Sequence, residues 1–397
     1  MKIFGVVCEY NPFHKGHLYQ LARTRELLGD DALCIAVMSG DFVQRGEAAQ
    51  FSKFARAEAA CRCGADLVFE LPVSYSLSSA EGFACGAVGM LSALGCEYIS
   101  FGSESADTDT MYKIARELLN PETQKTIREL MKKDGRLSYA AAREKLLKEK
   151  LGEAGECLSC PNDILGIEYI KALLELDSPM KPIAIKRVGA EHDAESGEGF
   201  RSASALRGML DRGEDVSEYI PPAAMEIFSR EMNAGRMKNR EKMELLILSR
   251  LRMLNEAEFE ALPDAQGGAG QRLYKAVRKN GSLEEIAADA SSKRYTAARM
   301  RRMCLCAALS IKADRTKNYS PLARLLAANR RGCRYLSGTE NLPVQILSKP
   351  AAVKQMPEQV QSVFASGAYA HDLYCLQFTH AEDRKSDGDW KTSPEIV

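Results

Sequence analysis

The sequence predicts an α/β fold, namely a Rossmann-like, doubly wound parallel sheet with a helical insertion, followed by a mostly α-helical C-terminal domain. Three observations lead to this prediction. Short apolar, β-branched runs alternate with segments of helical periodicity through the first third of the chain, an order typical of βαβ units. A charged, helical stretch without a strand signal then interrupts the alternation. Beyond Arg207 almost all of the periodicity is helical.

The predicted strands are continuous apolar runs, which suit strands buried on both faces of a parallel sheet. The strands are expected at Ile3–Cys8, Leu33–Met38, Asp66–Leu71, Tyr98–Phe101 and Pro182–Val188, and the helices between them at His17–Leu28, Lys53–Cys63 and Ala80–Leu94. In an open sheet of this type the functional site is expected at the carboxyl ends of the strands.

The same patterns divide the chain into three parts. Residues 1–210 form the predicted α/β domain, with the helical insertion at about 107–160. Residues 211–380 form the predicted helical domain. Residues 381–397 combine charged and small residues with a single Trp, and we predict that they form a disordered tail.

The composition is that of an ordinary globular protein, with 45% apolar and 27% charged residues in a chain of 397. No apolar run is long enough to span a bilayer, and Met1 and Lys2 lead into the first strand without a signal peptide. We therefore expect a cytoplasmic protein with no membrane partner.

Twelve cysteines are present, and most lie in apolar strands or helices. Reduced thiols in the core of a cytosolic protein explain them better than a disulfide framework does. No partner pair at zinc spacing accompanies the closely spaced pairs, so we predict no metal site. These pairs are Cys61 and Cys63, Cys157 and Cys160, and Cys304 and Cys306.

The formal net charge of zero conceals a strong local asymmetry. Between Gln271 and Arg334 there are sixteen Lys and Arg residues against four Asp and Glu residues, a local charge of +12. Because the whole chain is neutral, the remainder carries −12. Such an asymmetry indicates a partner with a phosphate backbone for the C-terminal part.

The most informative segment, E-Y-N-P-F-H-K-G-H, runs from Glu9 to His17 directly after the first predicted strand. It places His14 and His17 where that strand turns into a helix. A helix N-terminus offers unpaired N–H groups and a partial positive charge to an anion, and the imidazoles can donate further hydrogen bonds. We therefore predict that the segment binds a nucleoside triphosphate. The alternatives are a packed His14 with a capping His17, or a zinc site, for which the usual spacing and a third ligand are missing.

Three further positions are candidates for the same site. Gly102 ends the fourth predicted strand, where the absence of a Cβ lets a purine lie against the backbone; an ordinary turn glycine is the alternative. Asn162 opens a predicted helix and is either an N-cap or a ligand contact. Lys186 and Arg187 leave a buried strand beside the phosphate site, which favours a functional role.

Two other groups have equally open interpretations. The loop 39–46, S-G-D-F-V-Q-R-G, follows the second strand and either binds substrate or only connects elements, and Lys53 and Arg56 after it face either phosphate or solvent. Ser202–Arg207 opens a helix with two hydroxyl groups and an arginine one turn later. That arrangement suits a second anion, or it is a plain serine cap with Arg207 on the surface.

Taken together, these motifs resemble the bacterial tRNA(Met) cytidine acetate ligase family within the H-x-G-H nucleotidyltransferase superfamily. The resemblance spans nearly the whole chain. It rests on E-Y-N-P-F-H-K-G-H, S-G-D-F-V-Q-R-G-E, G-A-D-L-V-F-E-L-P, F-G-S-E, P-N-D-I-L-G, I-K-R-V, S-A-S-A-L-R and K-R-Y-T-A-A-R-M-R-R. The stretch 264–270 and the pair Ser291-Ser292 depart from the pattern of the family.

The resemblance implies a nucleotidyltransferase-type fold and an ATP-dependent ligase. Such an enzyme activates acetate as acetyladenylate and acetylates N4 of the wobble cytidine of elongator tRNA(Met), with ATP as co-substrate and Mg²⁺ as its expected counter-ion. No obligate protein partner is implied. His14, His17 and Arg207 are the implied catalytic residues. The implied ATP-binding residues are Val7, Cys8, Glu9, Tyr10, Asn11, Pro12, Phe13, His14, Lys15, Gly16, His17, Leu18, Tyr19, Gln20, Gly102, Asn162, Arg187 and Val188.

The basic C-terminal part is then the predicted tRNA-binding surface. Its candidate contacts are Arg272, Lys275, Lys279, Lys293, Arg294, Arg299, Arg301 and Arg302. Tyr295 either stacks on a base or belongs to the core. Two other functions remain open: an adenylyltransferase that acts on a small phosphorylated metabolite, which would not need the basic surface, and a non-enzymatic RNA-binding protein that depends on ATP.

Overall fold

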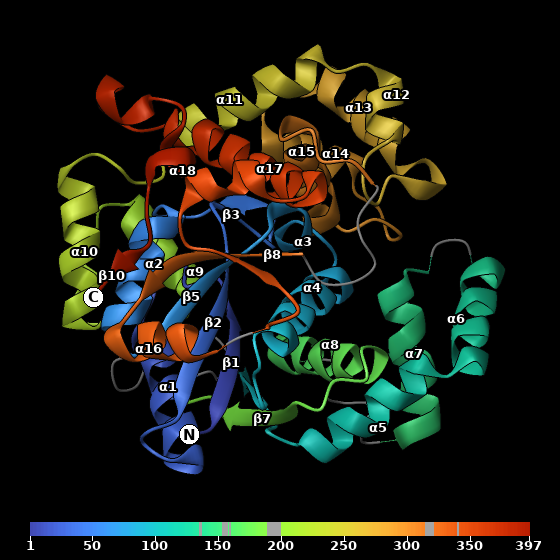
Figure 1. Cartoon of the computed structure of the whole chain (residues 1–397). Coiled ribbons are helices and arrows are strands. Elements are labelled where there is room, and N and C mark those ends of the chain that lie inside the picture. The colour runs from blue at the N-terminus through green and yellow to red at the C-terminus, as the bar shows by residue number, and fades with distance from the viewer. Residues whose placement is uncertain (135–136, 153–157, 159, 189–199, 314–320, 340) are drawn as a thin grey trace.

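The structure is a computed structural model that describes residues 1–397 except 135–136, 153–157, 159, 189–199, 314–320 and 340. Its centre is a mostly parallel sheet of strand order β10-β8-β5-β2-β1-β6-β7, with β9 paired to β8 (Figure 1). The strands are β1 (Ile3–Cys8), β2 (Leu33–Ser39), β5 (Leu67–Leu71), β6 (Tyr98–Ser103), β7 (Lys181–Lys186), β8 (Leu322–Ala328), β9 (Gln345–Leu347) and β10 (Glu395–Ile396). The five strands expected from the sequence are confirmed, each to within two residues at either end.

Both faces of the sheet are covered by helices, as the doubly wound prediction requires. Leu33, Ile35 and Val37 of β2 pack into one core with α4 and α8, whereas Ala36 and Met38 pack into another with α1, α2 and α10. This alternation follows from the two-residue period of a strand. The helices are α1 (Lys15–Leu28), α2 (Lys53–Arg62), α4 (Ala80–Ala93), α8 (Pro161–Glu175), α9 (Ala203–Asp211) and α10 (Pro222–Asn233).

The predicted helical insertion is confirmed as three helices joined by short connections. It consists of α5 (Thr108–Leu119), α6 (Pro121–Lys133) and α7 (Tyr139–Leu151). In Figure 1 these three helices lie together to one side of the sheet, and α8 leads the chain back to it.

The C-terminal helices build a core of their own. This core joins α11 (Arg240–Met253), α12 (Glu256–Glu260), α13 (Ala269–Lys279), α14 (Leu283–Ala290), α15 (Ala297–Ala308) and α17 (Glu358–Cys375). It also takes in Phe42 and Ala48, which belong to the small hairpin β3 (Phe42–Val43) and β4 (Glu47–Ala48) after β2. Short helices α3 (Val73–Ser76), α16 (Arg330–Gly338) and α18 (Gly388–Lys391) complete the structure.

The predicted helical domain over residues 211–380 needs one addition, because this stretch also contributes strands to the main sheet. Strand β8 from that stretch enters the main sheet and pairs antiparallel with β5, and β9 pairs with β8. All seven residues of β8 are buried. In a short run of Leu and Ala, hydrophobic periodicity cannot distinguish a buried strand from a buried helix. The sequence therefore did not reveal that this segment pairs with the main sheet.

The prediction that residues 381–397 form a disordered tail is wrong. Strand β10 pairs with β8 at the edge of the sheet, and the Trp390 ring packs against Phe364 with centroids 4.6 Å apart. Asp389 is fully buried and its Oδ2 accepts a hydrogen bond from Lys53 Nζ at 2.7 Å. The charged and small residues of this segment suggested disorder. The partner of the Asp389 carboxylate lies more than three hundred residues earlier in the chain, so composition alone could not reveal this contact. Among the described residues no helix is both long and apolar enough to cross a membrane.

Candidate active site

Two histidines stand where strand β1 passes into helix α1. His14 is the N-cap of α1, and its Nδ1 accepts a hydrogen bond from the Gly16 amide at 3.0 Å. His17 Nδ1 accepts the amide of His14 at 3.2 Å. The two rings stack with their centroids 3.8 Å apart. Backbone groups therefore fix the orientation of both imidazoles.

These contacts determine which ring nitrogen carries the proton. A nitrogen that accepts a hydrogen bond has no proton of its own, so each neutral ring carries its proton on Nε2. Burial, together with the nearby guanidinium groups of Arg187 and Arg207, lowers the pKa of His14 to about 4. Burial, His14 and Arg187 hold the pKa of His17 well below its usual value. At neutral pH both residues are uncharged Nε2–H donors.

The backbone amides of the first turn are already engaged within the protein. The Lys15 amide donates to the Tyr219 carbonyl at 2.9 Å, and the His17 amide donates to the His14 carbonyl at 2.9 Å. The Gly16 amide is taken by His14. The expectation that this turn offers unpaired amides to a phosphate is therefore corrected. The two Nε2–H groups and the positive end of the α1 dipole remain for an anion.

Two cavities adjoin the histidine pair and share His17, Gln20, Gly102 and Arg187. The smaller, of about 100 Å³, lies beside His14, and the larger, of about 400 Å³, lies at the carboxyl ends of β1 and β6. The members of the predicted ATP-binding segment that line them are Val7, Cys8, Glu9, Tyr10, Asn11, His14, Gly16, His17, Tyr19 and Gln20. Pro12, Phe13, Lys15 and Leu18 are not among the lining residues, and Phe13 is part of the core.

Strands β6 and β7 bring two more of the predicted residues to the shared part of the cavities. Gly102 pairs in register with Ile185, and a Cβ built on it would approach Arg187 Cγ at 3.5 Å. The Arg187 side chain is exposed, and no other side chain among the described residues pairs with its guanidinium. Val188 lines the smaller cavity. Arg187 is therefore a cation available to a phosphate.

Asn162 lines the larger cavity from the start of α8. It is not the N-cap of that helix, because Cys160 occupies the cap position. Its Nδ2 donates to the carboxylate of Glu104, and the other oxygen of Glu104 accepts the Asp163 amide at 3.1 Å. Glu104 thus fixes the direction in which the Asn162 amide points, which supports the ligand interpretation over the plain cap.

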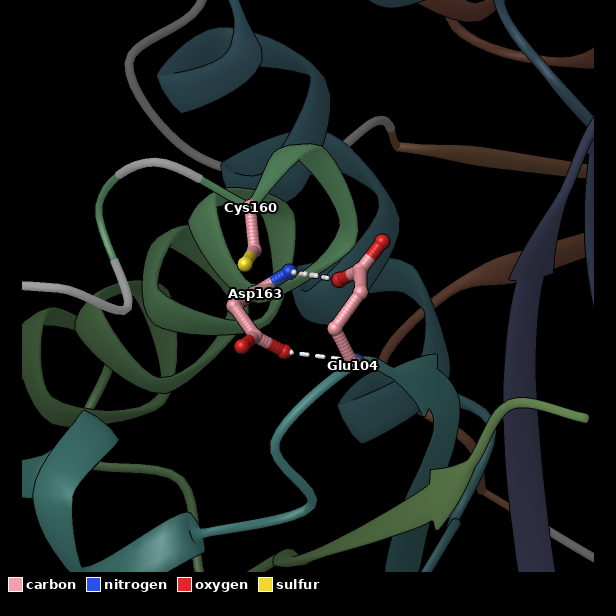
Figure 2. Close-up of side chains that lie close together, drawn as sticks. All are labelled: Glu104, Cys160 and Asp163. Atoms are coloured by element: carbon pink, nitrogen blue, oxygen red, sulfur yellow. Dashed lines mark hydrogen bonds between the residues drawn. The ribbon is translucent and has the colours of Figure 1, made fainter. Parts of the chain in front are cut away.

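Figure 2 shows the only group of possible metal ligands found among the described residues: Glu104, Cys160 and Asp163. Hydrogen bonds account for its carboxylates. Asp163 accepts the Ser103 hydroxyl and the Glu104 amide, and Glu104 accepts the Asn162 side-chain amide and the Asp163 backbone amide. Mg²⁺ prefers an octahedron of oxygen ligands that includes water and substrate phosphates, so a thiol between two engaged carboxylates does not suit it. Cys157 lies outside the described residues, and Cys61, Cys63, Cys304 and Cys306 are buried free thiols.

Arg207 lies beside the histidines but is occupied. Its Nη1 donates to the Asn11 carbonyl at 3.0 Å, and its Nη2 pairs with Glu47 at 3.1 Å. It is not among the residues that line the two cavities. The positive charge of Arg207 nevertheless contributes to the lowered pKa of His14. Its assignment as a catalytic residue stays a prediction.

The loop 39–46 after β2, for which the sequence left substrate binding and a plain connection open, contributes two residues to the site. Gln44 and Arg45, at the tip of the β3–β4 hairpin, line the larger cavity. Their place in the cavity wall supports the substrate-binding interpretation of this loop, which leaves the same sheet edge as the histidines. Lys53 and Arg56 do not reach the site. Lys53 pairs with buried carboxylates, and Arg56 donates to the carbonyls of residues 9, 39, 40 and 51.

The predicted RNA contacts divide into two groups. The side chains of Lys275, Lys279, Lys293, Arg294 and Arg301 are exposed. The other three stabilise the helical core: Arg272 donates to the Ala290 carbonyl at 2.8 Å, Arg299 donates to the Asp264 carbonyl, and Arg302 is buried. The prediction of Arg302 as a surface contact is wrong, because Arg302 lies on the buried side of α15, which packs into the helical core.

The core interpretation of Tyr295 is favoured by its surroundings. The ring is buried, its hydroxyl donates to the Gly267 carbonyl, and the guanidinium groups of Arg294 and Arg299 lie 5.5 and 4.9 Å from its centroid. Its faces are thus already covered. The loop that departs from the family pattern at 264–270 is the segment that Tyr295 and Arg299 hold in place.

Comparisons with known proteins agree with this geometry. A family model described as HIGH Nucleotidyl Transferase matches residues 1–389. The tRNA(Met) cytidine acetate ligase of Fervidobacterium nodosum is 37% identical over 397 aligned residues, which cover 95% of this chain and 92% of the relative. Two crystal structures of Thermotoga maritima TmcAL, each 34% identical and covered fully in both directions, superpose with TM-scores of 0.93 for the apo form and 0.92 for the form bound to alpha-thio ATP.

The chain belongs to the tRNA(Met) cytidine acetate ligase family. The resemblance drawn from the sequence motifs is thereby confirmed, as is the nucleotidyltransferase-type fold. One of the two superposed TmcAL structures holds an ATP analogue, so this relative from Thermotoga maritima binds a nucleotide. The histidine pair, the two cavities and the exposed Arg187 are the features of this chain that suit such a ligand.

Proposed function

We propose that this chain is an ATP-dependent acetate ligase. It activates acetate as acetyladenylate and transfers the acetyl group to N4 of the wobble cytidine of elongator tRNA(Met), which gives N4-acetylcytidine. The observation that carries the proposal is the pair of neutral Nε2–H donors beside the shared cavities, in a chain of this family.

Adenylation needs positioning and charge neutralisation more than acid–base chemistry. Acetate is already ionised at neutral pH, so its carboxylate can attack the α-phosphorus of ATP while pyrophosphate leaves in line. His14 and His17 donate hydrogen bonds to phosphate oxygens, and Arg187 offsets their negative charge. Mg²⁺ enters with ATP as part of the substrate. Asn162, fixed by Glu104, and Gly102 complete the nucleotide site.

The exposed basic side chains of the C-terminal helices supply the contacts for tRNA. Lys275, Lys293, Arg294 and Arg301 present positive charge without a carboxylate partner among the described residues. Contacts of this kind neutralise phosphates and make binding steeply dependent on salt. A tRNA substrate agrees with a cytoplasmic enzyme, which needs no membrane and no obligate protein partner.

The test separates activation from transfer. Purified protein should exchange pyrophosphate with ATP in a reaction that requires acetate and needs no tRNA, and mass spectrometry should find N4-acetylcytidine in tRNA(Met) after incubation. Removing one preorganised hydrogen-bond donor typically lowers the rate by about 10²–10³, so His14→Asn should reduce exchange by that factor. Undiminished exchange in His14→Asn would contradict the assignment.

The two alternative functions give different results in the same assay. An adenylyltransferase would exchange pyrophosphate with a phosphorylated metabolite in place of acetate. An RNA-binding protein would retain tRNA and ATP without any exchange.

A further inference from the structure

Glu9 is an acid in a site that otherwise suits phosphate. It is the only carboxylate among the described residues that line the two cavities. An ionised carboxylate cannot donate a hydrogen bond to a triphosphate oxygen, and it repels one. The activation of acetate needs no base either. The first half-reaction therefore leaves this side chain without a task.

The structure holds Glu9 on one side and leaves it open on the other. Its Oε1 accepts the Gln44 amide at 3.0 Å, and its backbone carbonyl accepts a hydrogen bond from the buried guanidinium of Arg56. Its Oε2 has no hydrogen-bond partner among the described residues. The Glu9 side chain lines the larger cavity together with His17 and with Asn162 at the start of α8.

We infer that Glu9 is the general base of the second half-reaction, an inference that rests on the function proposed above. In that step N4 of the cytidine attacks the acetyl carbonyl. The new N–C bond forms, the C–O bond to the adenylate phosphate breaks, and AMP leaves with the electron pair. Glu9 Oε2 accepts the proton that N4 gives up. Carboxylates are the usual acceptors for this exocyclic amine in nucleic-acid recognition.

The β3–β4 hairpin connects Glu9 to the tRNA-binding helices. Gln44, which holds the carboxylate, is followed by Arg45, whose carbonyl accepts a hydrogen bond from Arg301 Nε at 3.5 Å. A Cβ on the next residue, Gly46, would meet the Arg302 backbone nitrogen at 2.7 Å. The hairpin therefore contacts both the Glu9 carboxylate and helix α15, and it connects the proposed base with the proposed tRNA-binding surface.

The surroundings of Glu9 raise its pKa above the ordinary value of a glutamate. Burial raises its pKa, and Glu47 adds to this effect, whereas the Gln44 amide, Arg207 and Arg45 act in the opposite direction. His17, which shares the cavity, is uncharged at neutral pH. A base whose pKa lies closer to the working pH takes up a proton more effectively.

The test compares the two half-reactions in Glu9→Gln, which keeps an acceptor for the Gln44 amide. Loss of a general base typically lowers a rate by about 10²–10⁴. We expect that loss in single-turnover transfer to tRNA(Met) from synthetic acetyladenylate, whereas acetate-dependent pyrophosphate exchange falls less than tenfold. The wild-type transfer rate should decline at acidic pH as Glu9 takes up a proton, and this decline should be absent in Glu9→Gln. Glu9→Asp should regain part of the transfer rate.

Glu214→Gln removes an exposed acid after α9 and controls for the loss of one negative charge. An equal fall of exchange and transfer in Glu9→Gln would overturn the inference, since it would make Glu9 an ATP contact. Transfer at the wild-type rate would overturn it as well. If the wild-type protein shows no acetate-dependent exchange, the proposed function itself fails, and the two failures are thereby distinguished.

Discussion

At the scale of a single residue, His14 is the first proposed contact of the phosphate, and its protonation can be measured directly. Because Nδ1 accepts the Gly16 amide, we expect the uncharged ring with its proton on Nε2 throughout the neutral range. Nitrogen-15 NMR of labelled protein distinguishes the two tautomers and follows the titration. The His14 resonances should change only near pH 4, in line with its lowered pKa. A midpoint near 6.5 would contradict the buried, backbone-bound ring.

The same lowered pKa makes folding depend on pH. Native His14 takes up its proton near pH 4, whereas the unfolded chain does so near 6.5. The unfolded state therefore binds more protons between these values, and stability is lost as the pH falls through this window. The loss between pH 7.5 and pH 5 amounts to about 2 kcal/mol in the free energy of unfolding. His14→Asn, which keeps a capping acceptor, should reduce this loss when the two proteins are compared by urea unfolding.

At the scale of elements, the β3–β4 hairpin links the proposed ATP site to helix α15. Gly46 has φ of +80°, and a Cβ there would meet the Arg302 backbone nitrogen at 2.7 Å. Gly46→Ala should therefore displace the hairpin from α15 and weaken acetyl transfer to tRNA at least tenfold, about 1.4 kcal/mol. Gly213→Ala is the matched control, since Gly213 has φ of +71° with nothing within 4 Å of its Cβ.

Steady-state transfer assays and urea unfolding of both glycine variants provide the comparison. Both should lose the stability that a positive φ costs a residue with a side chain. Only Gly46→Ala should also lose transfer activity. Equal activity of the two variants would show that the contact between the hairpin and α15 is not needed for the tRNA-dependent step.

At the scale of the whole molecule, the sequence predicts contacts between residues that are close in the chain, and it does not predict contacts between residues that are far apart in the chain. The strand before His14 and the helix after it are adjacent in sequence, so the apolar run and the turn residues were enough to place them. The partners of Asp389 are Lys53 and Arg324, which no local pattern connects to it. The exposure of Arg301 and the burial of Arg302 follow from how α15 packs, which charge counting does not reveal.

We therefore expect the C-terminal segment, residues 381–397, to contribute to the free energy of unfolding of the whole protein. Asp389 lies between Lys53 Nζ, at 2.7 Å, and the guanidinium of Arg324, and all three side chains are buried. Removing one partner of a buried ion pair leaves an uncompensated charge and typically costs about 3–5 kcal/mol. We therefore expect Asp389→Asn to lower the free energy of unfolding by that amount in urea titration. Asp387→Asn, two residues earlier at an exposed pair 3.8 Å from Lys391, should change it by less than about 1 kcal/mol. Equal stability of the two variants would mean that the buried ion pairs of Asp389 in α18 do not stabilise the fold.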